Sequence, residues 1–331
     1  MFIMTVIRSS SMICVPLFLV LTGYLMCNKG LSAKFYLGII KTLGIYIISS
    51  IFCTLFKWFV LHQEHSPLSM IADISGFNGS RYAWYINMYI GLFLLIPFLN
   101  LIYNNLTSKR QKQLLVFTLL LLTAAPSLLN IFNFHAAGWW LHPSISTQYT
   151  QIVPNWWTGI YPFTYYFIGC YLREYGFILK ARTGLFAFLC FALLYGAFVF
   201  YRSHGSSFIS GDYDGWGALP ITILTVLIFG SLSKINLNSR SNLIKRILKQ
   251  VADLCLGGYL LSYIFDQIFY PKLIAAVPFM PDRLNYYIVI VPLVFVCSLA
   301  LSFVANLIYE ACLRLIRRII AASKLHASSD C

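Results

Sequence analysis

Residues 284–310 read LNYYIVIVPLVFVCSLALSFVANLIYE, a stretch with a single charged side chain, Glu310, at its end. A helix needs about 20 consecutive apolar residues to cross the hydrocarbon core of a membrane. This stretch is long enough to do so, and eight others resemble it in length and composition. We therefore predict nine membrane-spanning helices, at about residues 10–28, 35–61, 83–104, 113–133, 158–175, 183–201, 217–235, 252–270 and 284–310.

The composition of the whole chain leads to the same prediction. Of its 331 residues, 59% are hydrophobic and only 10% are charged, whereas about a quarter of the residues in ordinary soluble domains are charged. This composition excludes a soluble, disordered, fibrous or nucleic-acid-binding protein. We predict an all-α fold, a polytopic integral membrane helical bundle that forms a single domain over residues 1–331 and ends in a basic cytosolic tail at 318–331.

The positive charges indicate the orientation of the bundle. The net charge of +14 arises from 24 Lys and Arg against 10 Asp and Glu. Eighteen of the 24 lie on one side of the predicted membrane, in alternate loops and the tail, and six lie on the other side. Because cytoplasmic loops are enriched in Lys and Arg, we expect the side with eighteen, and with it the C-terminus, to face the cytoplasm.

The beginning of the chain is unusual under this topology. Nine spans that end inside must begin outside, so residues 1–7 and Arg8 are expected outside, and an inward-starting span is expected to be missing before them. The alternative is a cleaved signal peptide with Arg8 as its charge and residues 12–26 as its apolar core. The residues before Cys27 do not form a small-x-small cleavage site, so we favour the missing span.

An aromatic loop is predicted on the outer side. No charged residue occurs from Phe134 to Leu172, and the stretch contains two Trp pairs, one of them Trp156 and Trp157. Flat aromatic faces beside neutral hydrogen-bonding groups suit sugar rings. However, Trp and Tyr at headgroup level also form the aromatic belt that anchors many membrane proteins. We favour the belt and keep Trp156 and Trp157 as candidate substrate-binding residues.

Histidines and charges within spans are the candidates for catalysis. Five of the six His fall at the predicted outer surface, where a His suits proton transfer near neutral pH, although a lone loop His is usually only solvated. Asp266 and Lys57 lie near outer ends of spans; Asp266 is a candidate site residue, and Lys57 is expected to extend to the interface. Asp253 and Glu310 lie at cytosolic ends, and we expect each to pair with a nearby Lys or Arg. No Cys/His group has metal-ligand spacing, so no metal is predicted.

Basic residues in the cytosolic loops are candidates for holding the phosphates of a nucleotide-like donor. They are Lys34 with Lys41, and the group of Lys109, Arg110 and Lys112. The positive-inside rule also explains these charges, and from the residues alone we favour that interpretation.

Three stretches carry a resemblance to a known family. Residues 15–18, VPLF, leading to residues 22–25, TGYL, resemble the second-helix signature of the acyltransferase 3 family of bacterial membrane O-acyltransferases. Residues 82–92, YAWYINMYIGL, followed by residues 96–99, IPFL, are similar to the aromatic helix of that family. Residues 258–263, GYLLSY, resemble its late-helix signature, and the similarity covers the chain from about residue 10 to residue 310.

The resemblance implies a ten-helix enzyme of the bacterial cytoplasmic (inner) membrane. Such an enzyme takes an acyl group, usually acetyl, from cytosolic acyl-CoA and passes it to a hydroxyl of an envelope glycan or lipid-linked sugar, such as O-antigen, capsule or exopolysaccharide. Acetyl-CoA is then a donor substrate, and no bound cofactor is expected. Lys34 and Lys41 stand where the family has basic residues after its second helix, so they are the expected donor-binding residues. The expected substrate-binding residues are Arg81, Trp84, Tyr85, Asn87, Tyr89, Trp156 and Trp157.

The chain departs from the family pattern at polar positions. Ala83 stands where a His often precedes the aromatic pair, Asn87 where close relatives have Glu, and Ser262 where many members have His. The family's first helix, which carries an Arg and the His thought to act as general base, has no counterpart, so no catalytic base is assigned. Aromatic packing between helices explains residues 84–89 equally well. An inactive partner subunit and a lipid-linked sugar transporter or flippase are the alternative functions; the transporter predicts an inverted repeat, which we do not find in the sequence.

Overall fold

The computed structural model describes residues 2–63, 66–131, 150–203, 210–236 and 241–329, with side chains up to residue 319. These residues form thirteen α-helices and three short 3₁₀ helices, and no strand occurs among them, which confirms the all-α prediction. The helices are α1 (Phe2–Ser11), α2 (Cys14–Met26), α3 (Ala33–Leu37), α4 (Ile40–Phe59), α5 (Pro67–Ser75), α6 (Trp84–Asn105), α7 (Lys109–Ala124), α8 (Pro126–Leu129), η1 (Asn155–Ile160), α9 (Tyr161–Tyr175), α10 (Ala181–Arg202), η2 (Asp212–Asp214), α11 (Leu219–Ser233), α12 (Asn242–Ala276), η3 (Met280–Arg283) and α13 (Leu284–Ser329).

Six helical stretches of the described chain are long and apolar enough to cross a membrane, so the protein is a polytopic membrane protein. They are Phe2–Met26, Ala33–Phe59, Trp84–Asn105, Ala181–Arg202, Asp212–Ser233 and Met280–Ile319. The predicted number of nine is not confirmed. Helices do occur at the other three predicted spans, but α7 and α9 have only 16 and 15 residues, and the predicted span in α12 contains Asp253 and Asp266.

The first span begins earlier than predicted. Its helix starts at Phe2 rather than near residue 10, and only Met12 and Ile13 separate α1 from α2. Arg8 therefore lies inside a helical segment instead of in an outer stub. Its guanidinium group lies 3.0 Å from the buried carboxylate of Asp214, so the charge within this span has a partner of opposite sign.

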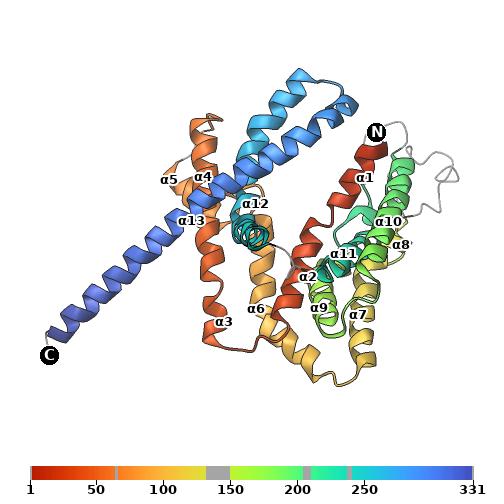
Figure 1. Ribbon diagram of the computed structural model, residues 1–331, viewed down its shortest axis with the longest axis horizontal. Helices are drawn as coiled ribbons and strands as arrows, with labels where there is room; N and C mark the ends of the chain where they lie inside the picture. The colour runs from red at the N-terminus through yellow and green to blue at the C-terminus, as the bar shows by residue number, and fades with distance from the viewer. Residues whose placement is uncertain (1, 64–65, 132–149, 204–209, 237–240, 330–331) are drawn as a thin grey trace. The chain divides into compact units, whose positions relative to one another are not determined.

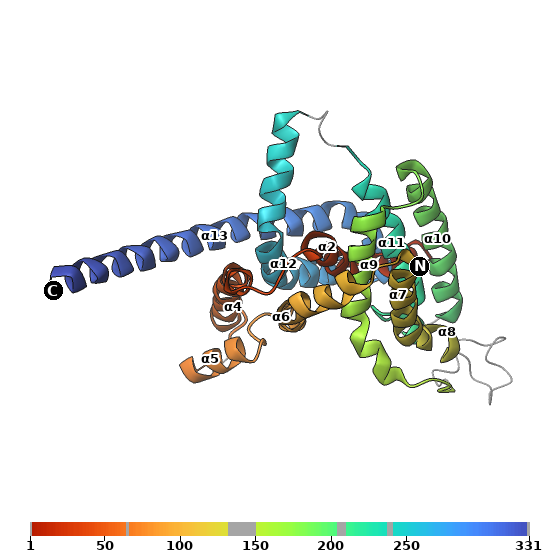
Figure 2. The same cartoon turned by 90° about the horizontal axis from the view of Figure 1, so that it is seen from below.

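The chain divides into two compact units, and the division falls within α6. Unit 1 comprises Met1–Leu31 and Leu94–Asn236, and unit 2 comprises Ser32–Phe93 and Leu237–Cys331. In unit 1, α2, α9 and α11 lie side by side (Figures 1 and 2).

Two glycines let α2 and α9 approach closely. A Cβ on Gly23 would collide with the carbonyl oxygen of Tyr166, and a Cβ on Gly169 would collide with that of Val20. Small residues at such crossings allow backbones to pack in membranes, where apolar burial alone does not drive helices together. Gly23 of the TGYL stretch is therefore required by the packing of unit 1.

The end of α2 is capped by a side chain from α6. The amide nitrogen of Asn100 donates to the carbonyl oxygens of Met26 and Lys29, each at 2.8 Å. The buried hydroxyl of Tyr166 donates in turn to the amide oxygen of Asn100 at 2.7 Å. Because helix ends leave carbonyls without internal partners, this arrangement satisfies groups that would be costly to bury.

In unit 2, α12 packs against α13 and α4. A Cβ on Gly257 would collide with the hydroxyl of Ser302, and that hydroxyl donates to the carbonyl oxygen of Leu254 at 2.8 Å. Cys53 of α4, Leu261 of α12 and Ala305 of α13 meet in the core of this unit. The close approach fixes the middle of α12, which contains the GYLLSY stretch.

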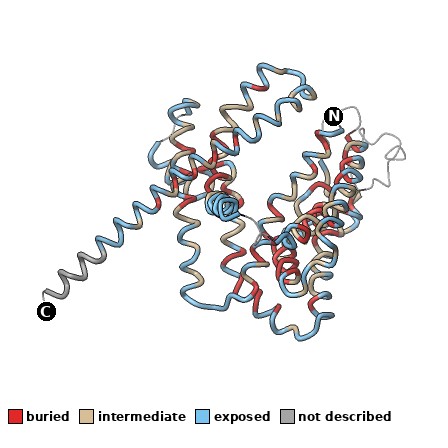
Figure 3. The backbone as a smooth tube through the Cα atoms, viewed as in Figure 1, coloured by how far each residue is buried: buried red, intermediate tan, exposed pale blue. Residues whose placement is uncertain are grey.

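Many large apolar side chains lie on the outside of the helices. Buried and exposed positions alternate along most of them (Figure 3), and exposed fractions reach 70% at Leu194 and 83% at Ile288. A helix that is apolar on its outer face as well as on its packed face is typical of a membrane span. The exposure of these residues therefore agrees with helices that face lipid.

Candidate functional site

Five tyrosine rings gather where the start of α6 meets α12 and form what we call the tyrosine cluster: Tyr82, Tyr85, Tyr89, Tyr259 and Tyr263. The ring centroids of Tyr82 and Tyr85 lie 5.4 and 6.0 Å from that of Tyr259. Tyr85 and Tyr89 are stacked with centroids 6.1 Å apart, and Tyr82 meets Tyr263 edge-on at 6.5 Å. Thus two of the three stretches singled out in the sequence, the aromatic helix and the late helix, are brought together.

A carboxylate of α12 anchors the edge of this cluster. The hydroxyl of Tyr82 donates to Asp266 at 2.6 Å, although 184 residues separate the two in sequence. Burial raises the pKa of Tyr82 well above its ordinary value, the hydrogen bond to Asp266 raises the same pKa further, and the positive charge of Arg81 partly opposes both effects. The phenol therefore stays protonated and acts as a donor at physiological pH.

Lys57 enters the same region from α4. Its ammonium group donates to the carbonyl oxygens of Gly79 at 3.2 Å and Asn78 at 3.5 Å, and it lies 5.6 Å from the ring centroid of Tyr263. The sequence predicted only that this side chain extends to the interface. Instead it binds the turn that precedes α6 and adds a positive charge beside the tyrosine cluster.

Ser80 was not predicted and connects that turn to α12. Its buried hydroxyl donates to the carbonyl oxygen of Leu260 at 2.9 Å, and the thiol of Cys53 lies 3.7 Å from the same oxygen. The turn carrying Arg81 and Tyr82 is thereby fixed against the late helix. No sequence signal distinguishes Ser80 from other loop serines, because its role depends on a partner 180 residues away.

The predicted residues of the aromatic helix separate into two groups. Trp84 is partly buried and meets the ring of Tyr85 edge-on at 6.2 Å, so it joins the cluster together with Tyr85 and Tyr89. Asn87 and Arg81 are exposed. Asn87 is therefore more exposed than the rings of the cluster, whereas Arg81 stands at the edge of the cluster next to Tyr82.

Lys34 and Lys41 lie at the other end of α4 from the cluster. Both are exposed, Lys34 in α3 and Lys41 in the first turn of α4. The hydroxyl of Ser32 caps α3, and the ring of Phe35 stacks on Phe93 at 4.4 Å. From Lys41 to Lys57 the helix rises by about 24 Å, so the two predicted sites lie near opposite ends of α4.

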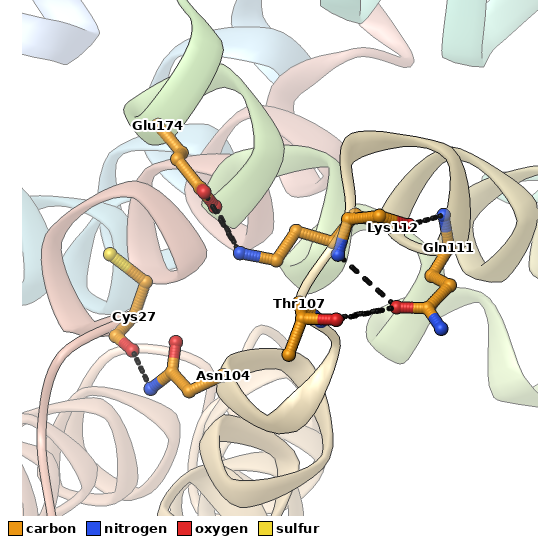
Figure 4. Close-up of polar contacts among 7 residues, drawn as sticks. Cys27, Asn104, Thr107, Gln111, Lys112 and Glu174 are labelled. Carbon is orange, nitrogen blue, oxygen red and sulfur yellow. Dashed lines mark hydrogen bonds and ion pairs between the residues drawn. The ribbon is translucent and has the colours of Figure 1, made fainter.

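Lys112 has a structural role in unit 1. It forms an ion pair with Glu174 at 2.7 Å, as Figure 4 shows between α7 and α9, and its side chain is only 9% exposed. Its ammonium group also lies 4.6 Å from the ring centroid of Tyr103. Since its charge is already compensated and buried, the structure disfavours Lys112 as a phosphate ligand.

Trp156 and Trp157 belong to unit 1, on η1. Their rings meet edge-on at 5.3 Å; Trp156 is 76% exposed, and Trp157 is partly buried. Their neighbours Asn155 and Thr158 line a pocket of about 220 Å³ within the same unit. The other Trp pair of the predicted aromatic loop lies outside the described residues.

Among the six histidines, only His62 has a described side chain. It is exposed and follows α4 with a left-handed φ of 53°. The expected partners of Asp253 and Glu310 are not observed: in the part of the chain with described side chains, ion pairs form only between Arg8 and Asp214 and between Lys112 and Glu174. The described residues also contain no group of three His, Cys, Asp or Glu placed to hold a metal ion.

Two of the altered polar positions lie close to the tyrosine cluster. Ala83 is completely buried, immediately after Tyr82. The hydroxyl of Ser262 donates to the carbonyl oxygen of Tyr259 within its own helix at 2.9 Å. Neither residue supplies a group able to take a proton from a substrate hydroxyl near neutral pH.

Comparison with known proteins gives one match. The model of the family Acyl_transf_3, described as an acyltransferase domain, matches residues 1–307. No curated protein matches the chain, and no solved structure matches it.

Proposed function

The chain belongs to the acyltransferase 3 family, and we propose that it transfers an acyl group, acetyl in the first instance, from acyl-CoA to a hydroxyl of a cell-envelope glycan. The reaction breaks the thioester C–S bond and forms an ester C–O bond. The proton of the acceptor hydroxyl leaves through a base, and the CoA sulfur departs as a thiolate that takes up a proton. We assign the base to no described residue.

The observation that carries the proposal is the meeting of the aromatic helix and the late helix around Tyr259. These stretches lie about 170 residues apart in sequence, and both contribute rings and polar groups to one cluster. Aromatic faces next to a hydroxyl, a carboxylate and two cations offer stacking surfaces and hydrogen-bonding groups for a sugar. The exposed Arg81 is placed to attract an acidic glycan.

The position of the two predicted sites supports a donor on one side and an acceptor on the other. Lys34 and Lys41 lie on the side that the distribution of Lys and Arg predicts to be cytoplasmic, where acyl-CoA is found. Both side chains are exposed, and in this proposal they hold the CoA phosphates as point charges. The tyrosine cluster lies near the opposite end of α4. The thioester end of the donor must therefore reach through the bilayer from the cytoplasmic side of a bacterial inner membrane.

Acyl transfer by a variant of the cluster tests the proposal. The purified full-length protein is given acetyl-CoA labelled in the acetyl group, together with membranes that carry the native glycan. We expect label on the glycan, and we expect Tyr82→Phe to lower the rate at least about tenfold, because the fold-change of one lost charge-assisted hydrogen bond is of that size.

Tyr286→Phe is the matched control, because Tyr286 is 48% exposed on α13 and lies outside the cluster. It should leave the rate unchanged. Equal rates for Tyr82→Phe and Tyr286→Phe would show that the cluster is not the site. No label on any glycan with this chain alone, and label when another membrane protein of the same cell is added, would favour the silent partner subunit.

A further inference from the structure

Unit 1 contains a pocket with aromatic rings and hydrogen-bonding groups in its walls, and none of its lining residues belongs to the tyrosine cluster. Its volume is about 220 Å³, and its walls come from the end of α7, from η1 and the start of α9, and from η2 and the turn before α11. Asn155 and residues 211–216 lie in loops that the distribution of Lys and Arg predicts to be outside, and the other lining residues lie in the spans next to these loops.

The wall of this pocket combines flat rings with hydrogen-bonding groups. Trp216 and Tyr161 supply the rings, whose centroids lie 6.4 Å apart. The carboxylate of Asp212 accepts hydrogen bonds, while Asn155 and Thr158 both donate and accept. Four glycines also line the pocket and leave backbone groups open to a ligand.

Buried side chains hold these walls in place. The carboxamide of Asn130, which is 1% exposed, accepts from the backbone N–H groups of Ile152 and Val153 at 2.8 and 3.0 Å, and it donates to the side-chain oxygen of Asn155. On the other side, the hydroxyl of Tyr165 donates to the carbonyl oxygen of Trp216 at 2.6 Å. A site whose supporting groups are already bonded loses little freedom when a ligand binds.

We propose that this pocket is a saccharide-binding subsite that takes one uncharged sugar residue of the acceptor glycan. Its volume equals that of about seven waters, which is the scale of a single sugar ring and far below that of a CoA molecule. The carboxylate of Asp212 accepts hydroxyl hydrogens and repels an acidic sugar, which sets the preference for an uncharged residue. The inference rests on the proposed function, since a sugar-binding site on the outer side is needed only if the acceptor is a glycan.

This assignment also separates the two interpretations of the aromatic loop. Trp156 is 76% exposed and does not line the pocket, so it keeps the belt interpretation. Trp216, which no sequence pattern singles out, is the ring that faces the sugar in this proposal.

Gly159 offers a direct test. It lines the pocket, and a Cβ added there would meet no other atom within 4 Å, so Gly159→Leu adds bulk at the pocket wall without a clash at Cβ. Gly30→Leu is the matched control, because a Cβ on Gly30 also meets nothing and Gly30 lies outside the pocket. Binding is measured on the full-length protein by saturation-transfer NMR, with methyl glucoside, methyl galactoside, methyl mannoside and methyl N-acetylglucosaminide as probes.

We expect at least one of the four probes to bind the parent protein and the Gly30→Leu variant equally, and to bind Gly159→Leu at least about tenfold more weakly. Asp212→Asn should weaken the same probe. Equal binding to all variants, or no binding of any probe at millimolar concentration, would overturn the inference.

Acyl transfer distinguishes a failure of this inference from a failure of the proposed function. If label reaches the glycan and Gly159→Leu leaves the KM for the glycan unchanged, the subsite is wrong and the enzyme stands. If no label is transferred but Gly159→Leu still abolishes probe binding, the subsite stands and the protein binds sugars without acylating them.

Discussion

The ion pair between Lys112 and Glu174 predicts an asymmetric response to mutation. The side chain of Lys112 is 9% exposed, whereas that of Glu174 is 40% exposed. Removing the carboxylate with Glu174→Gln leaves the ammonium group of Lys112 buried without its counter-charge. Because the pair is only half-buried, we expect this substitution to lower the free energy of unfolding by about 2–3 kcal/mol. Removing the ammonium group with Lys112→Met leaves a carboxylate that water can reach, and Met keeps apolar contact with Tyr103, so the cost should be about 1 kcal/mol or less.

Unfolding of the detergent-solubilised protein, followed by circular dichroism, measures both costs. The double variant should be more stable than Glu174→Gln alone, because no uncompensated charge remains. Lys112→Met should also leave the KM for acetyl-CoA unchanged. A larger loss of stability in Lys112→Met than in Glu174→Gln would refute the reasoning, and so would a raised KM for acetyl-CoA in Lys112→Met at unchanged stability.

Three more outcomes are expected. Gly23→Leu should lower unfolding free energy by about 3 kcal/mol or prevent folding, because its side chain must displace the backbone of Tyr166; thermal unfolding measures this. Lys34→Gln and Lys41→Gln should each raise the KM for acetyl-CoA about tenfold while leaving that for acetyl-pantetheine, which lacks the nucleotide phosphates, unchanged in steady-state assays. The stability advantage of the parent over Tyr82→Phe should be constant up to pH about 10 and decline above it. The phenol of Tyr82 ionises at that pH in the unfolded chain, whereas in the folded protein its raised pKa keeps it protonated. Unfolding at several pH values measures this.

Each of these predictions has a control or a contradicting result. Gly30→Leu makes the same change in open space and should unfold like the parent. Lys272→Gln removes an exposed lysine of the predicted outer side and should leave the KM for acetyl-CoA unchanged; an equal rise there would mean that net charge, not Lys34 and Lys41, holds the donor. If the stability advantage of the parent over Tyr82→Phe is already lost when the rising pH reaches 8, the phenol of Tyr82 is not the donor to Asp266.

Hydropathy located the helices of this chain well but did not settle which of them span the membrane. Apolar runs determine where a helix forms in lipid, because every backbone group must be bonded within the segment. Whether a helix spans also depends on its length and its polar residues. Helix α9, with 15 residues, and helix α12, which carries both Asp253 and Asp266, illustrate the difference.

The polar contacts could be predicted only in part. Asp266 was a candidate because a carboxylate in an apolar helix is costly without a partner, but nothing in the sequence identifies Tyr82 as that partner. Lys112 looks like any other lysine of a basic loop, and its burial depends on Glu174 and Tyr103 from other helices. The sequence around a residue can indicate that its side chain needs a partner, but tertiary packing determines which residue that partner is.

The central claim is that the acyl group is transferred across the bilayer. It is tested most directly by supplying acetyl-CoA to one face of the membrane at a time. Sealed inner-membrane vesicles containing the protein and its native glycan are prepared in both orientations, and acetyl-labelled acetyl-CoA is added outside. Label should reach the glycan only in vesicles whose cytoplasmic face is outward, and the labelled sugar should lie in the lumen. Labelling when acetyl-CoA meets only the opposite face, or labelled sugar on the same side as the donor, would contradict transfer across the bilayer.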